Sequence, residues 1–340
     1  AVIVKLERNY RSTQVILDAA SAVIAQNRHR KEKRLYTDQR GGSRIKIYRA
    51  GDDLDEAEFV ARVVRGALRD DTENTAAILY RTNAQSRTLE DALRRANTPY
   101  KIIGGVRFYE RKEIKDVLAY LRLVINPHDD VSFRRVVNVP TRGIGKTVME
   151  ALDNVDLSEA DSDLPPLLAV GLDPVVSRQS MWARMQVVID KKLVQPRAVQ
   201  ALKSFRDVLV SLAADGGHIG VSGLIARTLD DCGYLKDLRE ERSEDAEARI
   251  ENLMELVSAA REFESREVEP SLGGFVDRLS LLSDVDKDQG QQSDPKVMMM
   301  TLHSAKGLEF PTVVLAGLEE GLFPHSRSEE HTSELQSHHD

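Results

Sequence analysis

The amino-acid sequence predicts an α/β protein whose open, mostly parallel sheet is interrupted by a long helical insertion. Three observations lead to this prediction. Residues 1–106 alternate between strand-like and helix-like stretches, residues 110–283 are almost entirely helix-like, and apolar strand candidates return at 296–302 and 311–315. Strands separated by helices are typical of a parallel sheet. Because strands return after the helices, the helical block is expected to lie inside one α/β unit.

The first part of the chain supplies the first strands and helices. The runs VIVKL (2–6) and TAAILY (75–80) are apolar like buried strands, RIKIYR (44–49) alternates like a half-exposed strand, and residues 100–103 form a further candidate. Three helices are expected between these strands. Ser12 or Thr13 caps the first, and the other two span residues 53–68 and 85–96.

The middle of the chain has the apolar spacing of helices. These are expected at residues 110–124, 197–213, 221–229 and 244–263. Residues 156–190 combine prolines with mixed polarity, which predicts a loop or irregular insertion. The composition of residues 284–295 is that of a linker.

Composition and charge narrow the class of protein. The 340 residues are 41% hydrophobic and 30% charged, which fits a globular protein with room for two domains. No apolar stretch reaches the length of a membrane span, and the single cysteine excludes an internal disulfide framework, so a cytoplasmic protein without a membrane partner is expected. The net charge is −7, but residues 28–49 hold nine basic and two acidic residues. That stretch is either a phosphate-tracking surface or an ordinary solvated face.

The stretch VNVPTRGIGKTVMEAL (137–152) raises the question of a phosphate-binding loop, because GKT at 145–147 matches the end of G-x-x-x-x-G-K-[ST]. Pro140 stands where that pattern needs its first glycine, and proline has a fixed φ and no N–H for a phosphate. We therefore reject an ATP site at this position. The turn from Gly143 to Gly145 is expected either to meet a DNA phosphate or to be an ordinary turn between helices.

In LERNYRST (6–13) a predicted strand leads into a helix start. Tyr10 and Arg11 are then expected at the C-terminal edge of the sheet, where ligands bind in open α/β folds. An aromatic ring can stack on a base, and an arginine can neutralise charge on a phosphate. The alternative is a Tyr-Arg pair on the surface without a ligand.

In VMMMTLHSAKGLE (297–309) a buried strand delivers polar side chains to a loop. His303 and Lys306 can donate to a phosphodiester backbone, and Glu309 can accept from a ribose hydroxyl. The methionines are expected in the core. For His303 a purely structural role is the alternative.

Both ends of the chain have unusual sequences. The first residues, AVIVKL, have the pattern of a buried strand without a preceding methionine. Residues 327–338, RSEEHTSELQSH, are polar without periodicity and resemble the translation of a sequencing-library adapter. We expect residues 326–340 to be a non-native tail and set them apart from the fold.

Several of these strings together resemble one protein family. LERNYRST is similar to motif IV, and TLHSAKGLEF to motif V, of the UvrD/PcrA/Rep family of superfamily I DNA helicases. ILYRTNAQSR, PYKIIGGVRFYERKEIKDVLAYLRL, NVPTRGIG and GLEEGLFPH follow the same family in the same order. The resemblance implies a RecA-like second motor domain (2A), P-loop NTPase-like but without its own P-loop, over residues 1–107 and 296–325. It implies an inserted helical domain (2B) over residues 108–295.

The resemblance also implies site residues. Tyr10 would stack on adenine, Arg11 would reach the γ-phosphate as the catalytic arginine, and Glu309 would bind the ribose. Gly143 and Gly145 would contact duplex DNA. The positions that resemble the single-strand path, together with the chemically suited Lys306, are Tyr80, Arg81, Asn83, Arg107, His303, Lys306 and His325.

The function implied is the 2A/2B half of an ATP-dependent 3′-to-5′ DNA helicase of repair or replication. Its partners would be single-stranded DNA, the single-strand/duplex junction, the first motor domain, and repair or replication proteins. ATP is expected with Mg²⁺, whose ligands belong to the first motor domain, so no metal site is expected here. Motif VI, with a second γ-phosphate arginine, is expected after residue 325, where the adapter-like tail stands.

Two alternatives stay open. One is a module without enzymatic activity that binds DNA or a protein partner through the helical block. The other is the helicase subunit of a recombination nuclease complex.

At the duplex contact, Arg142 and Lys146 are expected to supply positive charge, so that their replacement weakens duplex binding and its salt dependence.

Overall fold

The computed structural model describes residues 7–25, 34–39, 41–70, 74–155, 179–216, 218–289, 295–320 and 322. Its centre is a parallel sheet in the order β2-β3-β1-β4. The strands are β1 (Ala76–Tyr80), β2 (Tyr100–Ile102), β3 (Val297–Thr301) and β4 (Thr312–Leu315). Strands that precede and follow the helical block are therefore hydrogen-bonded neighbours. This confirms the α/β class and the predicted return of strands after the helices.

One face of the sheet is covered by two helices, α2 (Asp53–Asp70) and α3 (Ser86–Arg95). Alternate strand residues point to this face, because the side-chain period of a strand is two residues. Ile78, Met299 and Leu93 are among the buried members of this core. On β4 the alternation exposes Val313 by 49% and Leu315 by 47%.

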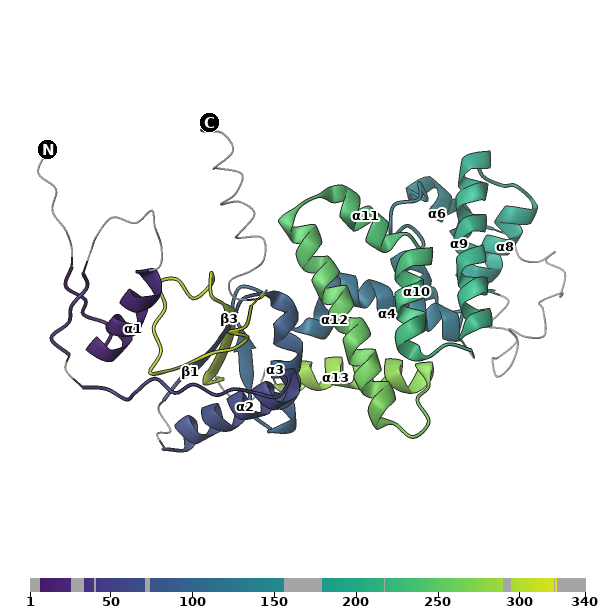
Figure 1. Cartoon of the computed structure of the whole chain (residues 1–340). Coiled ribbons are helices and arrows are strands. Elements are labelled where there is room, and N and C mark those ends of the chain that lie inside the picture. The colour runs from purple at the N-terminus through teal and green to yellow at the C-terminus, as the bar shows by residue number, and fades with distance from the viewer. Residues whose placement is uncertain are drawn as a thin grey trace, which may run out of the picture.

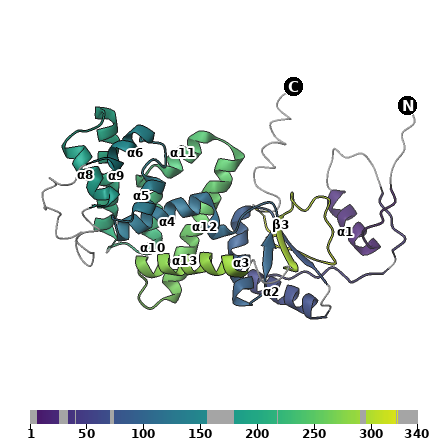
Figure 2. The same cartoon turned by 180° about the vertical axis from the view of Figure 1, so that it is seen from behind.

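The second part of the molecule is a body of helices beside the sheet, and α1 (Gln14–Ile24) lies on the opposite side of the sheet from it (Figures 1 and 2). These helices enclose a separate hydrophobic core that contains Tyr120, Phe133, Phe205 and Leu253. Their bounds are α4 (Lys112–Ile125), α5 (Asp130–Val136), α6 (Lys146–Asp153), α8 (Met181–Asp190), α9 (Pro196–Asp215), α10 (Val221–Asp231), α11 (Tyr234–Glu241), α12 (Glu244–Arg266) and α13 (Leu272–Gln289). Two short 3₁₀ turns, η1 (Asn83–Gln85) and η2 (Phe108–Glu110), lie where the two parts meet, η1 against α12 and η2 before α4. The two separate cores support domain boundaries near residues 107 and 296, which stay a prediction.

Three expectations about elements need correction. Residues 44–49 form no strand, and Ile47 is 94% exposed. Side chains tie this segment to α2 instead, because the ring of Tyr48 stacks on Phe59 at 3.8 Å and its hydroxyl donates to Asp55 at 2.8 Å. Part of the expected irregular insertion is the helix α8, and α13 continues to Gln289, into the expected linker. The predicted strand at residues 2–6 lies outside the described residues.

The first helix begins close to its predicted start but is capped differently. Thr13 is the N-cap residue and makes no side-chain capping bond. Asn9 Oδ1 instead accepts hydrogen bonds from the backbone N–H groups of Arg11, at 2.9 Å, and Ser12, at 2.8 Å. Such a turn fixes the backbone at the two residues that precede the helix.

Candidate nucleotide and nucleic-acid interface

Loops that follow three neighbouring strands meet at one edge of the sheet. Because the strands are parallel, their C-terminal ends lie at the same edge. Arg81 follows β1, and its Nη1 lies 3.0 Å from Nδ1 of His303, which follows β3. Gly104, after β2, has a φ of +76°, and a Cβ at this glycine would lie 3.0 Å from Ser304 Oγ. The structure thus brings together side chains that are far apart in the sequence.

Gln85 fixes the turn that carries Arg81. Its Oε1 accepts from the backbone N–H groups of Arg81 and Thr82, both at 2.9 Å. Gly317, after β4, packs against this side chain so closely that a Cβ would lie 1.9 Å from Gln85 Nε2. The sequence reading did not single out Gln85. The pattern T-x-x-Q at 82–85 was the available signal, since it resembles a capping box.

The residues predicted for the single-strand path have different environments. Asn83, His303 and Lys306 are exposed, and Arg81 and Arg107 are half-buried. The guanidinium of Arg107 lies 5.3 Å from the ring centre of Tyr100. These side chains occupy the loop edge of the sheet or the turns next to it.

Another predicted member of that set, Tyr80, is buried. Tyr80 is 1% exposed and belongs to the core under α2 and α3. Burial raises the pKa of its hydroxyl, and the nearby Glu90 raises it further. Tyr80 is therefore a packing residue in this structure. His325 lies outside the described residues.

The residues predicted to bind the nucleotide form an exposed pair and a neighbouring ring. Nε of Arg11 donates to Glu309 Oε2 at 2.7 Å, and both side chains are more than half exposed. Tyr10 is 71% exposed, with the guanidinium of Arg8 4.9 Å from its ring centre. An open aromatic ring, an arginine and a carboxylate are a donor and acceptor set that fits a base, a phosphate and a ribose.

A single loop, residues 302–309, joins these two sets. His303 at its start contacts Arg81, and Glu309 at its end contacts Arg11. The loop is held by its own hydrogen bonds, including Ala305 N to Thr301 O at 3.1 Å and Thr301 Oγ1 to Ser304 Oγ at 3.0 Å. The two sets of residues are therefore linked by one short, internally bonded segment.

The Gly143–Gly145 turn joins α5 to α6 in the helical body. A phosphate-binding loop would follow a strand, so this arrangement agrees with the rejection of an ATP site. Gly143 is exposed with a φ of +79°, Ile144 is 2% exposed, and Gly145 is the N-cap residue of α6. The side chain of Lys146 is 90% exposed. The guanidinium of Arg142 instead turns inward, which differs from the expected charge contact.

The comparisons with known proteins now identify the family. Residues 4–162 and 199–338 match the model of the UvrD-like helicase C-terminal domain. The chain belongs to this family. It is 40% identical to the ATP-dependent DNA helicase PcrA of Bacillus subtilis over 334 residues, which cover 96% of this chain and 43% of that protein. DNA helicase II of Escherichia coli shows the same identity and coverage. PcrA of Staphylococcus aureus is 38% identical over 326 residues, 95% of this chain and 42% of the relative.

The UvrD-like chain spans less than half the length of these relatives. The family resemblance and the fold class expected from the motifs are confirmed. The family match omits residues 163–198, which include α8, and it extends to residue 338, within the stretch set apart as an adapter-like tail. The nature of that tail and the roles of the individual site residues stay predictions.

Buried charges connect the sheet-bearing and helical parts of this UvrD-like chain. Arg87 on α3 is 3% exposed and donates to Glu255 at 2.5 Å and Glu262 at 3.0 Å, both on α12. Arg111 donates to Ser86 Oγ and to Asn252 Oδ1, each at 2.7 Å. A cavity of about 100 Å³ lies beside Arg87 between α3, α12 and α13. Arg87 and Arg111 thus each have a partner on α12, which fixes how these helices meet.

Metal-binding clusters and membrane-crossing helices are two features that the described part of the chain lacks. It contains no cluster of three or more His, Cys, Asp or Glu side chains that could hold a metal ion. None of its helices combines the length and the apolar character needed to cross a bilayer.

Proposed function

We propose that this chain is the second motor domain with its inserted helical domain, 2A and 2B, of an ATP-dependent 3′-to-5′ DNA helicase. It would act in repair or replication in the bacterial cytosol, together with a first motor domain. The loop of residues 302–309 carries the proposal, because it connects the nucleotide set at Glu309 to the DNA set at His303. A motor needs such a connection, since the state of the nucleotide must alter the grip on the strand.

ATP is the proposed substrate at the first set. The Tyr10 ring would stack on the base, Arg11 would meet the γ-phosphate, and Glu309 would accept from the ribose. Both members of the exposed ion pair can turn to a ligand at little cost, because surface pairs contribute only about 0–1 kcal/mol. The Mg²⁺ that accompanies ATP would be held by carboxylates of the first motor domain.

Single-stranded DNA is the proposed ligand of Arg81, Asn83, Arg107, His303 and Lys306. These groups donate hydrogen bonds or carry positive charge, which suits contact with phosphates and makes binding independent of base sequence. The duplex ahead of the strand would meet the turn from Gly143 to Gly145, where exposed glycines let a phosphate approach the backbone closely.

The named relatives favour this proposal over the helicase subunit of a nuclease complex. The three relatives are PcrA proteins or DNA helicase II, and they align with nearly the whole chain. The alternative of a binding module without enzymatic activity predicts no role for the pair of Arg11 and Glu309. An ATPase measurement can therefore separate the two.

The strand contact is tested with the chain itself. Affinity for a fluorescent oligothymidylate is measured by anisotropy over a series of KCl concentrations. Arg81→Ala should weaken binding and lower the slope of log K against log[salt] by about 0.7, the value for one single-strand phosphate contact. Arg206→Ala on α9, which removes a charge paired with Asp207, is the control and should leave the affinity unchanged. An Arg81→Ala slope equal to that of the parent chain would contradict the contact.

The nucleotide contact is tested in a protein in which this chain is joined to a first motor domain. Arg11→Ala should lower ATP turnover by about 10³-fold, the contribution typical of an arginine that reaches a transferring phosphoryl group. The fold should be intact by circular dichroism. Full turnover in this variant would remove Arg11 from the proposed ATP site.

A further inference from the structure

The loop that carries Gly143 and Gly145 is fixed on its inner side. Asn138 Oδ1 accepts from the backbone N–H groups of Arg142, at 2.8 Å, and Ile144, at 3.1 Å. The Ile144 side chain, only 2% exposed, inserts into the helical core between the two exposed glycines. The inner surface of the loop is therefore bonded and packed, while its outer surface is bare.

Arg142 provides the strongest of these inner attachments. Its Nη1 donates to the carbonyl oxygens of Val136, at 3.3 Å, and Pro140, at 3.1 Å. Its Nη2 donates to the hydroxyl of Tyr120, at 2.7 Å, and to the carbonyl oxygen of Cys232, at 2.9 Å. The four acceptors surround the guanidinium, which is a geometry that only a planar fork of donors can satisfy.

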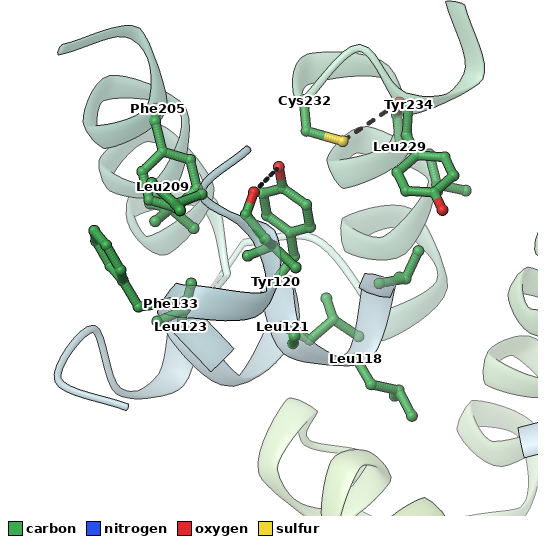
Figure 3. Close-up of a cluster of buried hydrophobic side chains, with 14 of the residues drawn as sticks. Leu118, Tyr120, Leu121, Leu123, Phe133, Phe205, Leu209, Leu229, Cys232 and Tyr234 are labelled. Carbon is green, nitrogen blue, oxygen red and sulfur yellow. Dashed lines mark hydrogen bonds between the residues drawn. The ribbon is translucent and has the colours of Figure 1, made fainter. Parts of the chain in front are cut away.

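Aromatic rings complete this pocket. The guanidinium carbon lies 5.5 Å from the ring centre of Phe205 and 5.9 Å from that of Tyr120, within the range of cation–π attraction. Tyr120 belongs to α4, Phe205 to α9, and Cys232 follows α10 (Figure 3). Arg142 therefore ties the loop to three parts of the helical body. A group with these contacts faces the core and is turned away from any ligand on the outer surface.

We infer that Arg142 is a positioning residue for duplex DNA: it holds the surface of Gly143, Gly145 and Lys146 in place and does not itself touch a phosphate. The inference rests on the proposed duplex contact of this loop. A loop whose supporting side chains are removed binds its ligand more weakly, because part of the binding free energy is then used to order the loop. Lysine cannot replace this arginine, since a single ammonium group cannot reach acceptors on several sides at once.

The test separates a positioning role from a direct contact by salt dependence. Affinity of the 340-residue chain for a fluorescent duplex with a single-stranded tail is measured by anisotropy at several KCl concentrations. Arg142→Lys should weaken binding on the order of tenfold, because lysine cannot hold the loop. Arg142→Gln, which removes the charge, should also weaken binding but leave the slope of log K against log[salt] unchanged, because no phosphate contact is lost. Lys146→Ala, at the exposed surface, should lower that slope by about 0.9, as loss of one duplex phosphate contact does.

Two further variants control for folding. Arg184→Lys alters another half-buried arginine that donates to backbone carbonyls, those of Leu152 and Asp153 at the far end of α6, and should leave duplex affinity unchanged. Tyr120→Phe leaves the charge unchanged and removes one acceptor of Arg142, together with the hydrogen bonds that the hydroxyl donates to the carbonyl oxygens of Val136 and Val139. It should weaken duplex binding in the same direction as Arg142→Lys. Tyr120→Phe keeps the inference testable if the Arg142→Lys chain does not fold.

The outcomes are distinct. A reduced salt slope in Arg142→Gln would overturn the inference in favour of a direct contact. Full duplex affinity in a folded Arg142→Lys or Tyr120→Phe chain would reduce Arg142 to a purely structural residue. Lys146→Ala could leave both affinity and slope unchanged while Arg142→Lys weakens binding. The proposed duplex contact of the outer loop surface would then be wrong, and Arg142 would position a different DNA-binding surface. Single-stranded DNA affinity should be equal in all five variants.

Discussion

Arg11 Nε lies 2.7 Å from Glu309 Oε2, which joins the turn before α1 to the loop after β3 across 298 positions of the sequence. The pair is exposed on both sides, with side-chain exposures of 52% and 69%. An ion pair of this kind contributes little to folding, since water screens the charges. Its exposure, and that of Tyr10 next to Arg11 in the sequence, agree better with a ligand-binding role than with a structural one.

Replacing Glu309 by glutamine should therefore leave the stability of the chain nearly unchanged. We expect the free energy of unfolding in urea to fall by less than about 1 kcal/mol, because only an exposed pair is lost. The same substitution in a protein joined to a first motor domain should weaken ATP binding. A large loss of stability would show that the pair holds the fold and would weaken its assignment to the nucleotide.

The isolated chain should not turn over ATP. The sequence has no G-x-x-x-x-G-K-[ST] loop, because Pro140 interrupts its nearest match, and the backbone donors that cradle phosphates are then missing. A malachite-green assay with single-stranded DNA present should give only background phosphate release. Turnover that disappears in Arg11→Ala would contradict this expectation.

Arg87 should be essential for stability. Removing its guanidinium leaves Glu255 mostly buried without its ion-pair partner at the junction of α3 with α12, and leaves Glu262 with Arg266 alone. Burial already raises the pKa of Glu255, and Arg87 opposes that rise. Arg87→Met should lower the free energy of unfolding by about 3 kcal/mol, the lower end of the loss when one partner of a buried pair is removed.

Two variants check the origin of that loss by urea denaturation. Adding Glu255→Gln to Arg87→Met should restore part of the stability, because the unpaired charge is then removed. Lys236→Ala, which breaks the exposed pair with Glu240, should change stability by less than about 0.5 kcal/mol. Equal effects of Arg87→Met and Lys236→Ala would mean that the buried network is not coupled to folding.

Gly317 and Gly307 offer a matched pair of substitutions. Both have a positive φ, of +72° and +93°, but a Cβ at Gly307 would meet nothing within 4 Å, whereas one at Gly317 would lie 1.9 Å from Gln85 Nε2. Gln85 cannot yield without losing its bonds to the backbone of Arg81 and Thr82. Gly307→Ala should cost about 1 kcal/mol from backbone strain, and Gly317→Ala about 3 kcal/mol. Equal thermal unfolding of the two variants would contradict this close packing.

Cys232 should react slowly with thiol reagents in the folded chain. Burial raises the pKa of its thiol to about 11, and the thiolate is the reactive form. The reaction with a disulfide reagent should be slow at pH 8 and should accelerate as the pH rises toward 11. The same chain unfolded in guanidinium should react at once. Because folding favours the neutral thiol, its contribution to stability is complete below about pH 8.5 and is lost as the pH rises toward 11. Rapid reaction of the folded chain at pH 8 would contradict the burial.

The local pattern of the sequence determined much of this protein. The spacing of apolar residues predicted the strands at 75–80 and 296–302 and the long helices, because alternation and helical periodicity are properties of neighbouring residues. The strings LERNYRST and TLHSAKGLEF indicated the family. Pro140, at the position where the P-loop pattern needs its first glycine, excluded a P-loop.

Only the tertiary structure decided which of these residues meet. The pairs of Arg11 with Glu309, Arg81 with His303 and Arg87 with Glu255 join distant segments, and their partners depend on the sheet order and on the meeting of α3 with α12. The direction of a side chain is likewise set by packing, so Tyr80 is in the core, Arg142 faces inward, and residues 44–49 lie against α2 without forming a strand. Periodicity records how a residue relates to its neighbours in the chain, whereas burial and pairing depend on where the rest of the chain folds.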